Sequence, residues 1–171
     1  MSYNIHPLLV HFPIAFLFLY SIIKIMPFQR WFPSVSWKHI ERTLLLVGVL
    51  GAFASSSTGE IAEELTNPNS QLVDMHAFFA SASTWLYGLI LAGEILYFLT
   101  PFLASKFSIA PLIALLSFFQ KILQDPILSK VLALLGLIAI SITGMLGGVM
   151  VYGLSADPLA EILLRVLNIN I

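Results

Sequence analysis

Residues 131–152 read VLALLGLIAISITGMLGGVMVY, a stretch without a charged side chain or a proline. A hydrocarbon core about 30 Å thick needs roughly 20 helical residues at about 1.5 Å each, so this stretch is long enough to cross a membrane. Three other stretches qualify or nearly do, and the predicted spans are about 8–27, 41–59, 74–100 and 127–152. The sequence predicts an all-α integral membrane protein, in which residues 1–171 form a single domain built on a four-helix transmembrane bundle.

The overall composition supports this class. Only 10% of the residues are charged, against roughly 25% in a soluble domain, and 58% are apolar. The absence of Cys excludes disulfides, thiolate metal sites, covalently attached c-type haem and iron–sulfur clusters. A net charge of −1, with basic residues confined to the flanks of the spans, predicts the lipid bilayer as a partner and no nucleic acid.

The first span contains two prolines near its start. A helix that began at Pro13 would leave too few residues before Pro27 to cross the membrane. We therefore expect the helix to begin at Pro7, a favoured first-turn position, and to be kinked at Pro13. The kink should free the carbonyl of Leu9, in the same turn as His11.

The charges of the connections predict the orientation. Two connections are basic, and they contain Lys24, Arg30, Lys38 and Arg42 in the first and Lys106, Lys121 and Lys130 in the second. The connection 59–75 has no Lys or Arg but contains Glu60, Glu63, Glu64 and Asp74. Because basic loops stay in the cytoplasm, both termini and the 59–75 connection should lie outside.

Two further segments are predicted to be amphipathic helices in the interface, at about 109–124 and 158–167. In the first, a stripe of small and polar residues runs beside an apolar face, with Pro111 near the start. The second, on the outer face, should be capped by Asp157, with Pro158 in its first turn.

Small residues at four-residue spacing predict where the spans touch, since such stripes allow close approach of helices in lipid. The stripes are Ala80, Thr84, Gly88 and Ala92 in the third span, Gly144 and Gly148 in the fourth, and Gly48 and Ala52 in the second. His76 lies one step before Ala80, so it should face the bundle.

The topology brings several ionisable residues to the outer leaflet. Ionisable groups at membrane depth are costly and are functional candidates, and imidazole binds haem iron, zinc or copper. The candidate metal ligands are His6, His11, Glu63, Glu64 and His76. The alternative is that the carboxylates form a solvated helix end, that His6 lies among the lipid headgroups, and that the other histidines hydrogen-bond to neighbouring helices.

On the inner side, Glu94 lies five helical turns after His76 on the same face. Lys24 should lie at a comparable depth, so we expect a Glu94–Lys24 ion pair or a Lys24 side chain that reaches the headgroups. A proton path from Glu94 to His76 is the other hypothesis. The sequence contains no catalytic motif, and no enzymatic activity of its own is expected.

Several motifs together resemble the bacterial membrane family known as domain of unknown function 2231. They are HPLLVHFPIAF at 6–16, STGEIAEEL at 57–65, the later His76, and TGMLGGVMVYG at 143–153. The resemblance implies a four-helix protein of the bacterial inner membrane, and motif residues His6, Pro7, His11, Pro13, Gly59, Glu63, His76, Gly147, Gly148 and Tyr152. The family commonly has T-G-H-L-G-G where this chain has Met145 in place of His. Association with cytochromes and respiratory modules implies haem or electron-transfer chemistry by analogy only.

The leading functional hypothesis is therefore a b-type haem-binding electron-transfer subunit of a respiratory or photosynthetic complex. In this hypothesis His11 and His76 bind haem b, with Met145 as an alternative axial ligand, and other membrane subunits of a redox complex are partners. The alternatives are a non-haem metal or proton site in a binding or transport protein, and an accessory structural subunit.

The predicted orientation can be tested with fused reporters. A reporter placed after Ile171 should report a periplasmic location and one inserted at residue 120 a cytoplasmic location, because of the basic connections. A cytoplasmic location after Ile171 would mean that the segment around 108–123 crosses the membrane and that the four-span prediction is wrong.

Overall fold

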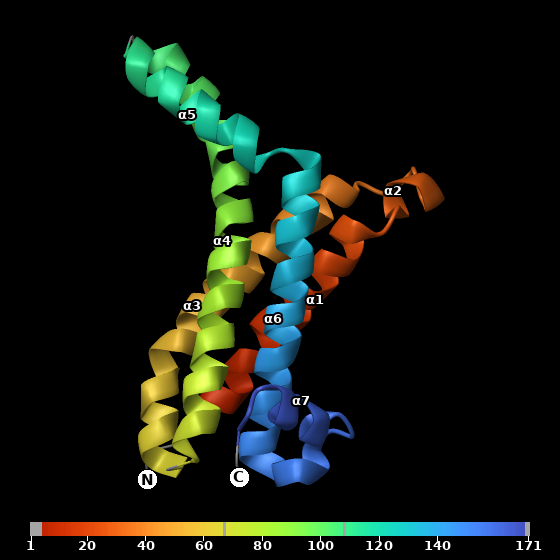
Figure 1. Cartoon of the computed structure of the whole chain (residues 1–171). Coiled ribbons are helices and arrows are strands. Elements are labelled where there is room, and N and C mark those ends of the chain that lie inside the picture. Colours follow the sequence, from red (N-terminus) through yellow and green to blue (C-terminus); the bar gives the residue numbers. More distant parts are fainter. Residues whose placement is uncertain (1–4, 67, 108, 170–171) are drawn as a thin grey trace.

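The computed structural model describes residues 5–66, 68–107 and 109–169 (Figure 1). These residues form helices and no strand, and four helices are long and apolar enough to span a membrane, which confirms the predicted fold class. The four are α1 (His6–Ile25), α3 (Trp37–Thr66), α4 (Ser70–Lys106) and α6 (Pro126–Tyr152). The shorter elements are α2 (Phe28–Trp31), α5 (Ala110–Leu123), the 3₁₀ helix η1 (Gly153–Ala156) and α7 (Ala160–Val166).

Local sequence determines where the long helices begin and end. The side chain of Asn69 accepts from the backbone N–H groups that open α4, and Asp125 does the same for α6. Pro7 occupies the first turn of α1, as predicted. Gly153 follows α6 with φ of 69°, a left-handed conformation that glycine adopts without a steric penalty.

The four long helices form a ring in the order α1, α3, α4, α6. Each packs against the two beside it, so α1 lies diagonally opposite α4 and α3 opposite α6 (Figure 1). One end of the ring, the basic end, is where α1 ends and α3 begins. The other, the acidic end, is where α3 ends and α4 begins.

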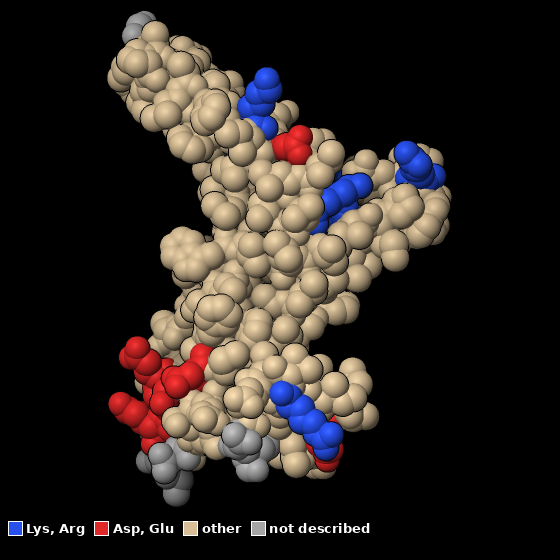
Figure 2. Space-filling model, in the orientation of Figure 1, with Lys and Arg blue, Asp and Glu red and all other residues tan. Residues whose placement is uncertain are grey.

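Figure 2 shows that the charges separate along the bundle. Acidic side chains gather at the acidic end over α3 and α4, while Lys and Arg lie mainly at the basic end. The middle of this face has no charged side chain. This distribution is what a hydrocarbon core requires of a protein that crosses it.

At the centre of the four-helix ring, buried Tyr and Ser side chains contact one another. The hydroxyls of Ser21 and Tyr87 are 2.7 Å apart, and Ser21 also donates to the carbonyl of Ala133 at 3.1 Å. The Tyr20 ring meets Tyr87 edge to face, with centroids 6.1 Å apart. Gly136 makes room for the Tyr87 ring, because a Cβ there would lie 2.7 Å from its Cζ. These contacts join α1, α4 and α6.

Close helix contacts occur at some of the predicted small residues but not at all of them. A Cβ on Gly48 would lie 2.5 Å from Leu17, and Gly51, which is not in a predicted stripe, lies against the ring of Pro13. Gly88, however, has no atom within 4 Å of an added Cβ, so its predicted place in a contact seam is wrong. The close contact on α4 is at Gly93, where a Cβ would lie 2.9 Å from Leu123.

The two short helices α5 and α7 pack differently from each other. α5 turns back along the last turns of α4 and has no buried residue (Figure 1). After α6, Asp157 accepts from the N–H of Leu159 at 2.7 Å, and α7 folds back under the acidic end. There it completes a second apolar cluster, formed by Leu72, Leu146, Val149, Ala160, Leu164 and Ile169.

The glycine contacts generate a test of the packing. Gly136→Ala should destabilise the protein by about 1–3 kcal/mol, because its Cβ overlaps the buried ring of Tyr87. Gly88→Ala should be neutral or slightly stabilising, because the site is open and alanine favours the helix. Thermal unfolding in detergent measures both. Equal stability of the two variants would show that the Tyr87 contact does not hold the helices together.

Candidate functional site

Two histidines from diagonally opposite helices lie near each other at the acidic end. His6 begins α1, and its Nδ1 lies 2.9 Å from the hydroxyl of Thr58 and 3.1 Å from the carbonyl of Ser55. His76, in the second turn of α4, has its Nδ1 3.0 Å from the carbonyl of Thr143. The two rings are near enough to interact electrostatically.

The hydrogen bonds to carbonyls fix the chemistry of both rings. A carbonyl oxygen can only accept, so the Nδ1 of each ring must carry the hydrogen. In a neutral imidazole the Nε2 is then unprotonated and presents a lone pair. This is the tautomer of a metal-binding histidine whose other nitrogen is held by a backbone carbonyl.

We call His6 and His76 the histidine pair. All four long helices contribute residues to the site around it. α3 and α6 supply the carbonyls, and each also places a glycine beside a ring. A Cβ on Gly59 would lie 3.7 Å from Cε1 of His6, and a Cβ on Gly147 would lie 3.3 Å from Cε1 of His76. Larger residues at position 147 would therefore displace the His76 ring.

His11 does not join this pair. Its side chain is exposed, and its Nδ1 donates to the carbonyl of Pro7, one turn earlier in the same helix. Pro13 is buried instead, with its ring against Gly51 of α3. The structure therefore does not bring together His11 and His76, the two haem ligands predicted from the sequence.

The other predicted ligands also lie apart from the pair. Met145 is two residues from both Thr143 and Gly147, which face His76, so it lies on the opposite side of α6. Glu63 and Glu64 are exposed at the end of α3. Within the described ranges, no group of three or more His, Asp or Glu residues could hold a metal ion, so the five predicted metal ligands do not converge.

Periodicity contains the signal that favours His6 over His11. His6, Pro13, Leu17 and Tyr20 recur at the spacing of one helix face, and the last three are buried. His11 falls between these positions, among exposed residues such as Phe12 and Phe18.

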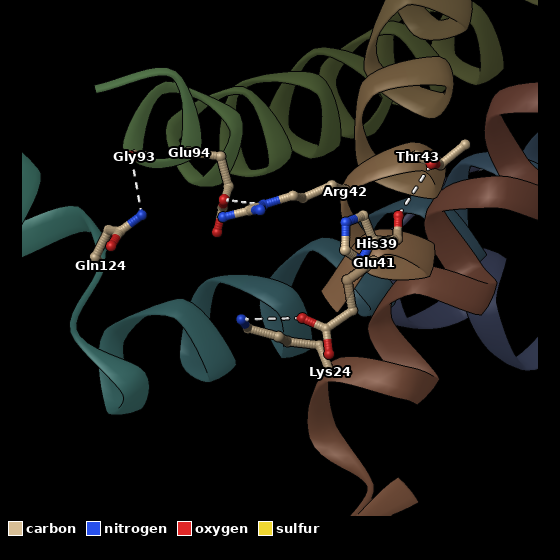
Figure 3. Close-up of polar contacts among 8 residues, drawn as sticks. All are labelled: Lys24, His39, Glu41, Arg42, Thr43, Gly93, Glu94 and Gln124. Atoms are coloured by element: carbon tan, nitrogen blue, oxygen red, sulfur yellow. Dashed lines mark hydrogen bonds and ion pairs between the residues drawn. The ribbon is translucent and has the colours of Figure 1, made fainter. Parts of the chain in front are cut away.

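A second polar group lies at the basic end (Figure 3). Nζ of Lys24 is 3.4 Å from Glu41, and Nε of Arg42 is 2.8 Å from Glu94. The amide of Gln124 donates to the carbonyl of Gly93 at 3.2 Å. The predicted Glu94–Lys24 pair is therefore wrong, because each of these residues has another partner from α3.

The arrangement of the ring explains the pairing. Glu41 and Arg42 are consecutive on α3, and α3 lies between α1 and α4, so one residue faces each neighbour. A cavity of about 310 Å³ lies beside the two pairs, and its polar lining includes Lys24, Gln29, Lys38, Glu41, Glu94 and Gln124.

Aromatic rings hold the arginine of this group. The guanidinium carbon of Arg42 lies 4.7 Å from the ring centroid of Phe98 and 5.4 Å from that of Tyr97, with Nζ of Lys38 5.0 Å from Tyr97. Nη2 of Arg42 is buried and has no hydrogen-bond partner in the described part of the chain. Such an arrangement fixes the helices against one another. Among these side chains no nucleophile or acid–base pair for catalysis is evident.

The Arg42–Glu94 pair is largely buried, with about a quarter of each side chain exposed. Arg42→Met or Glu94→Leu alone should cost about 1–3 kcal/mol, because the remaining charge keeps its partial burial without its partner. The double variant should lose less than the sum of the two. Unfolding in detergent measures this cycle, and Glu161→Ala in the exposed Arg165–Glu161 pair is the control that should change little. Additive losses would show that Arg42 and Glu94 do not interact.

No family model matches this chain, and no similar curated protein and no similar solved structure were found. The resemblance to the family of unknown function 2231 stays a prediction from the sequence motifs.

Proposed function

We propose that this protein binds a b-type haem between His6 and His76 and serves as an electron-transfer subunit in a membrane. The observation that carries the proposal is the pair of imidazoles on diagonally opposite helices, each held at Nδ1 by a carbonyl of a third helix. The pair replaces the predicted ligands His11 and Met145.

The number of ligands favours haem over a bare ion. Structural zinc takes four protein ligands and catalytic zinc takes three, whereas haem iron needs at most two because the macrocycle supplies the rest. The described residues offer two imidazoles here and no third His, Asp or Glu to make a metal group. When bound, haem would supply reversible one-electron chemistry.

The chain's own residues would orient and accommodate the group. The carbonyls of Ser55 and Thr143 hold both rings at Nδ1, which fixes the orientation of the two imidazoles. Gly59 and Gly147 place no side chain beside the ring edges. The helices that carry the two ligands, α1 and α4, pack mainly against α3 and α6 rather than against each other, which supports a bound group between them.

The distribution of Lys and Arg suggests on which side of the membrane the histidine pair would lie. By the positive-inside rule the basic end faces the cytoplasm, and the histidine pair then lies near the periplasmic face of a bacterial inner membrane. Other subunits of a redox complex would exchange electrons with the site from that face.

A second candidate is a divalent ion at the same two imidazoles, with water completing its coordination. The partial exposure of His6 favours this candidate, because water can reach that ring. Metal analysis together with visible absorption distinguishes the two candidates.

The test is cofactor content per folded protein, purified gently from membranes. The unmutated protein should show a haem absorption spectrum that changes on reduction, and His6→Ala or His76→Ala should abolish it, since one ligand leaves the iron under-coordinated. His11→Ala is the matched control, an exposed histidine on the same helix, and His39→Ala controls for the other end.

Several outcomes would contradict the proposal. Loss of the spectrum in His11→Ala with its retention in His6→Ala would restore the ligand set predicted from sequence. A divalent metal without haem would favour the second candidate. A colourless and metal-free protein would leave the histidines as hydrogen-bonded struts between helices.

A further inference from the structure

The last turns of α4 and the whole of α5 form an arm, residues 95–107 and 109–123, that projects from the basic end (Figure 1). The arm lies beyond the two ion pairs, which involve Lys24, Glu41, Arg42 and Glu94. Glu94 is 24 residues after Ser70, about 36 Å along the helix, so α4 has already crossed a hydrocarbon core before the arm begins. The arm is therefore too far along the bundle axis to be an ordinary continuation of the span.

The surface of the arm is nevertheless as apolar as a span. No residue of α5 is buried, and its partly covered face, which includes Ile113, Leu116 and Gln120, is turned to α4. The exposed large apolar residues of the arm include Ile95, Phe102 and Phe107 on the α4 side and Leu115, Phe118 and Phe119 on α5. A contiguous patch of this kind normally marks a surface covered by a membrane or a partner.

The charged residues of the arm indicate which kind of molecule covers its apolar surface. From 95 to 123 the sequence contains two charged residues, Lys106 and Lys121, and both are exposed. The nearest acids, Glu94 and Asp125, flank the arm at its base. A surface with large apolar side chains and only positive charge is complementary to anionic phospholipid headgroups over acyl chains.

The cavity between the two helices of the arm is also suited to a phospholipid. A cavity of about 520 Å³ is lined by apolar residues such as Phe98, Pro101 and Ile113, together with hydroxyl and amide groups. The hydroxyl of Thr100, which is only 5% exposed, has no hydrogen-bond partner in the described residues. A phospholipid offers both apolar chains and polar ester or headgroup atoms to such a lining.

From these observations we propose that the arm is an anchor that lies in the headgroup region at the basic end and binds anionic phospholipid. The exposed leucine and phenylalanine side chains insert among the acyl chains, and Lys106 and Lys121 contact the phosphates. The arm then occupies the plane of the membrane surface, which accounts for an apolar hairpin beyond the ion pairs.

The absence of Cys makes a direct test possible, because a single introduced Cys can be spin-labelled without background. The full-length protein with Phe118→Cys, a 59% exposed position, is reconstituted in vesicles of phosphatidylcholine alone or with phosphatidylglycerol. Collision rates with oxygen and with a water-soluble nickel complex then report the depth of the label. Ser36→Cys, exposed at the same end, is the aqueous control, and Trp85→Cys, 67% exposed in the middle of α4, is the control in the acyl chains.

The expected result is a label at 118 that is shielded from nickel and accessible to oxygen, and deeper in vesicles that contain phosphatidylglycerol. Lys106→Gln with Lys121→Gln should remove that dependence on lipid charge. Access to nickel equal to that at position 36 would overturn the proposal, as would a depth independent of lipid charge. Dipolar coupling between labels on two molecules in both lipids would also overturn it, because it would assign the arm to a second copy. Thermal stability of each labelled variant checks that the fold is intact.

Discussion

The absence of water from a hydrocarbon core is the constraint on which this structure depends. Every backbone group must be paired within its own helix, and a side-chain hydroxyl must find a partner inside the protein. Several hydroxyls in the spans do so locally, as when Thr84 donates to Ala80 and Thr143 to Ala139, both within their own helices. The buried hydroxyls of Ser55 and Thr100 are exceptions, with no partner among the described residues. Ser21 and Tyr87 are different, because they pair across the bundle and so determine how α1 and α4 sit relative to each other.

The same constraint places the ionisable groups at the two ends and gives each end a different character. At the basic end α3 offers Glu41 to one neighbour and Arg42 to the other, so charge neutralisation and helix packing are achieved together. At the acidic end the carboxylates stay exposed, and the histidine pair is held by hydrogen bonds to carbonyls and a hydroxyl. The first arrangement uses opposite charges to fix helices, whereas the second uses hydrogen bonds to orient two imidazoles.

Helix periodicity and hydropathy predict the fold well, because both depend on near neighbours in the sequence. The four long helices follow from apolar length, and the contact at Gly48 follows from small-residue spacing. Which face of a helix meets which neighbour depends on the order of helices in the ring, which no local pattern contains. The pairing of Lys24, the open position of Gly88 and the exposure of His11 all depend on that order.

The distance between the two ends limits what the protein can do between them. His76 and Glu94 lie on one helix about 27 Å apart, and the polar groups between them include Ser83, Thr84 and Tyr87. The first two hydroxyls donate to the carbonyl of Ala80, and Tyr87 is engaged with Ser21, so these groups form no relay along the described part of α4. A redox group bound at the histidine pair, as proposed, would exchange electrons and protons at the acidic end. The core hydroxyls named above pair with a carbonyl of their own helix or with each other, so the described part of α4 offers no continuous polar path between the two ends.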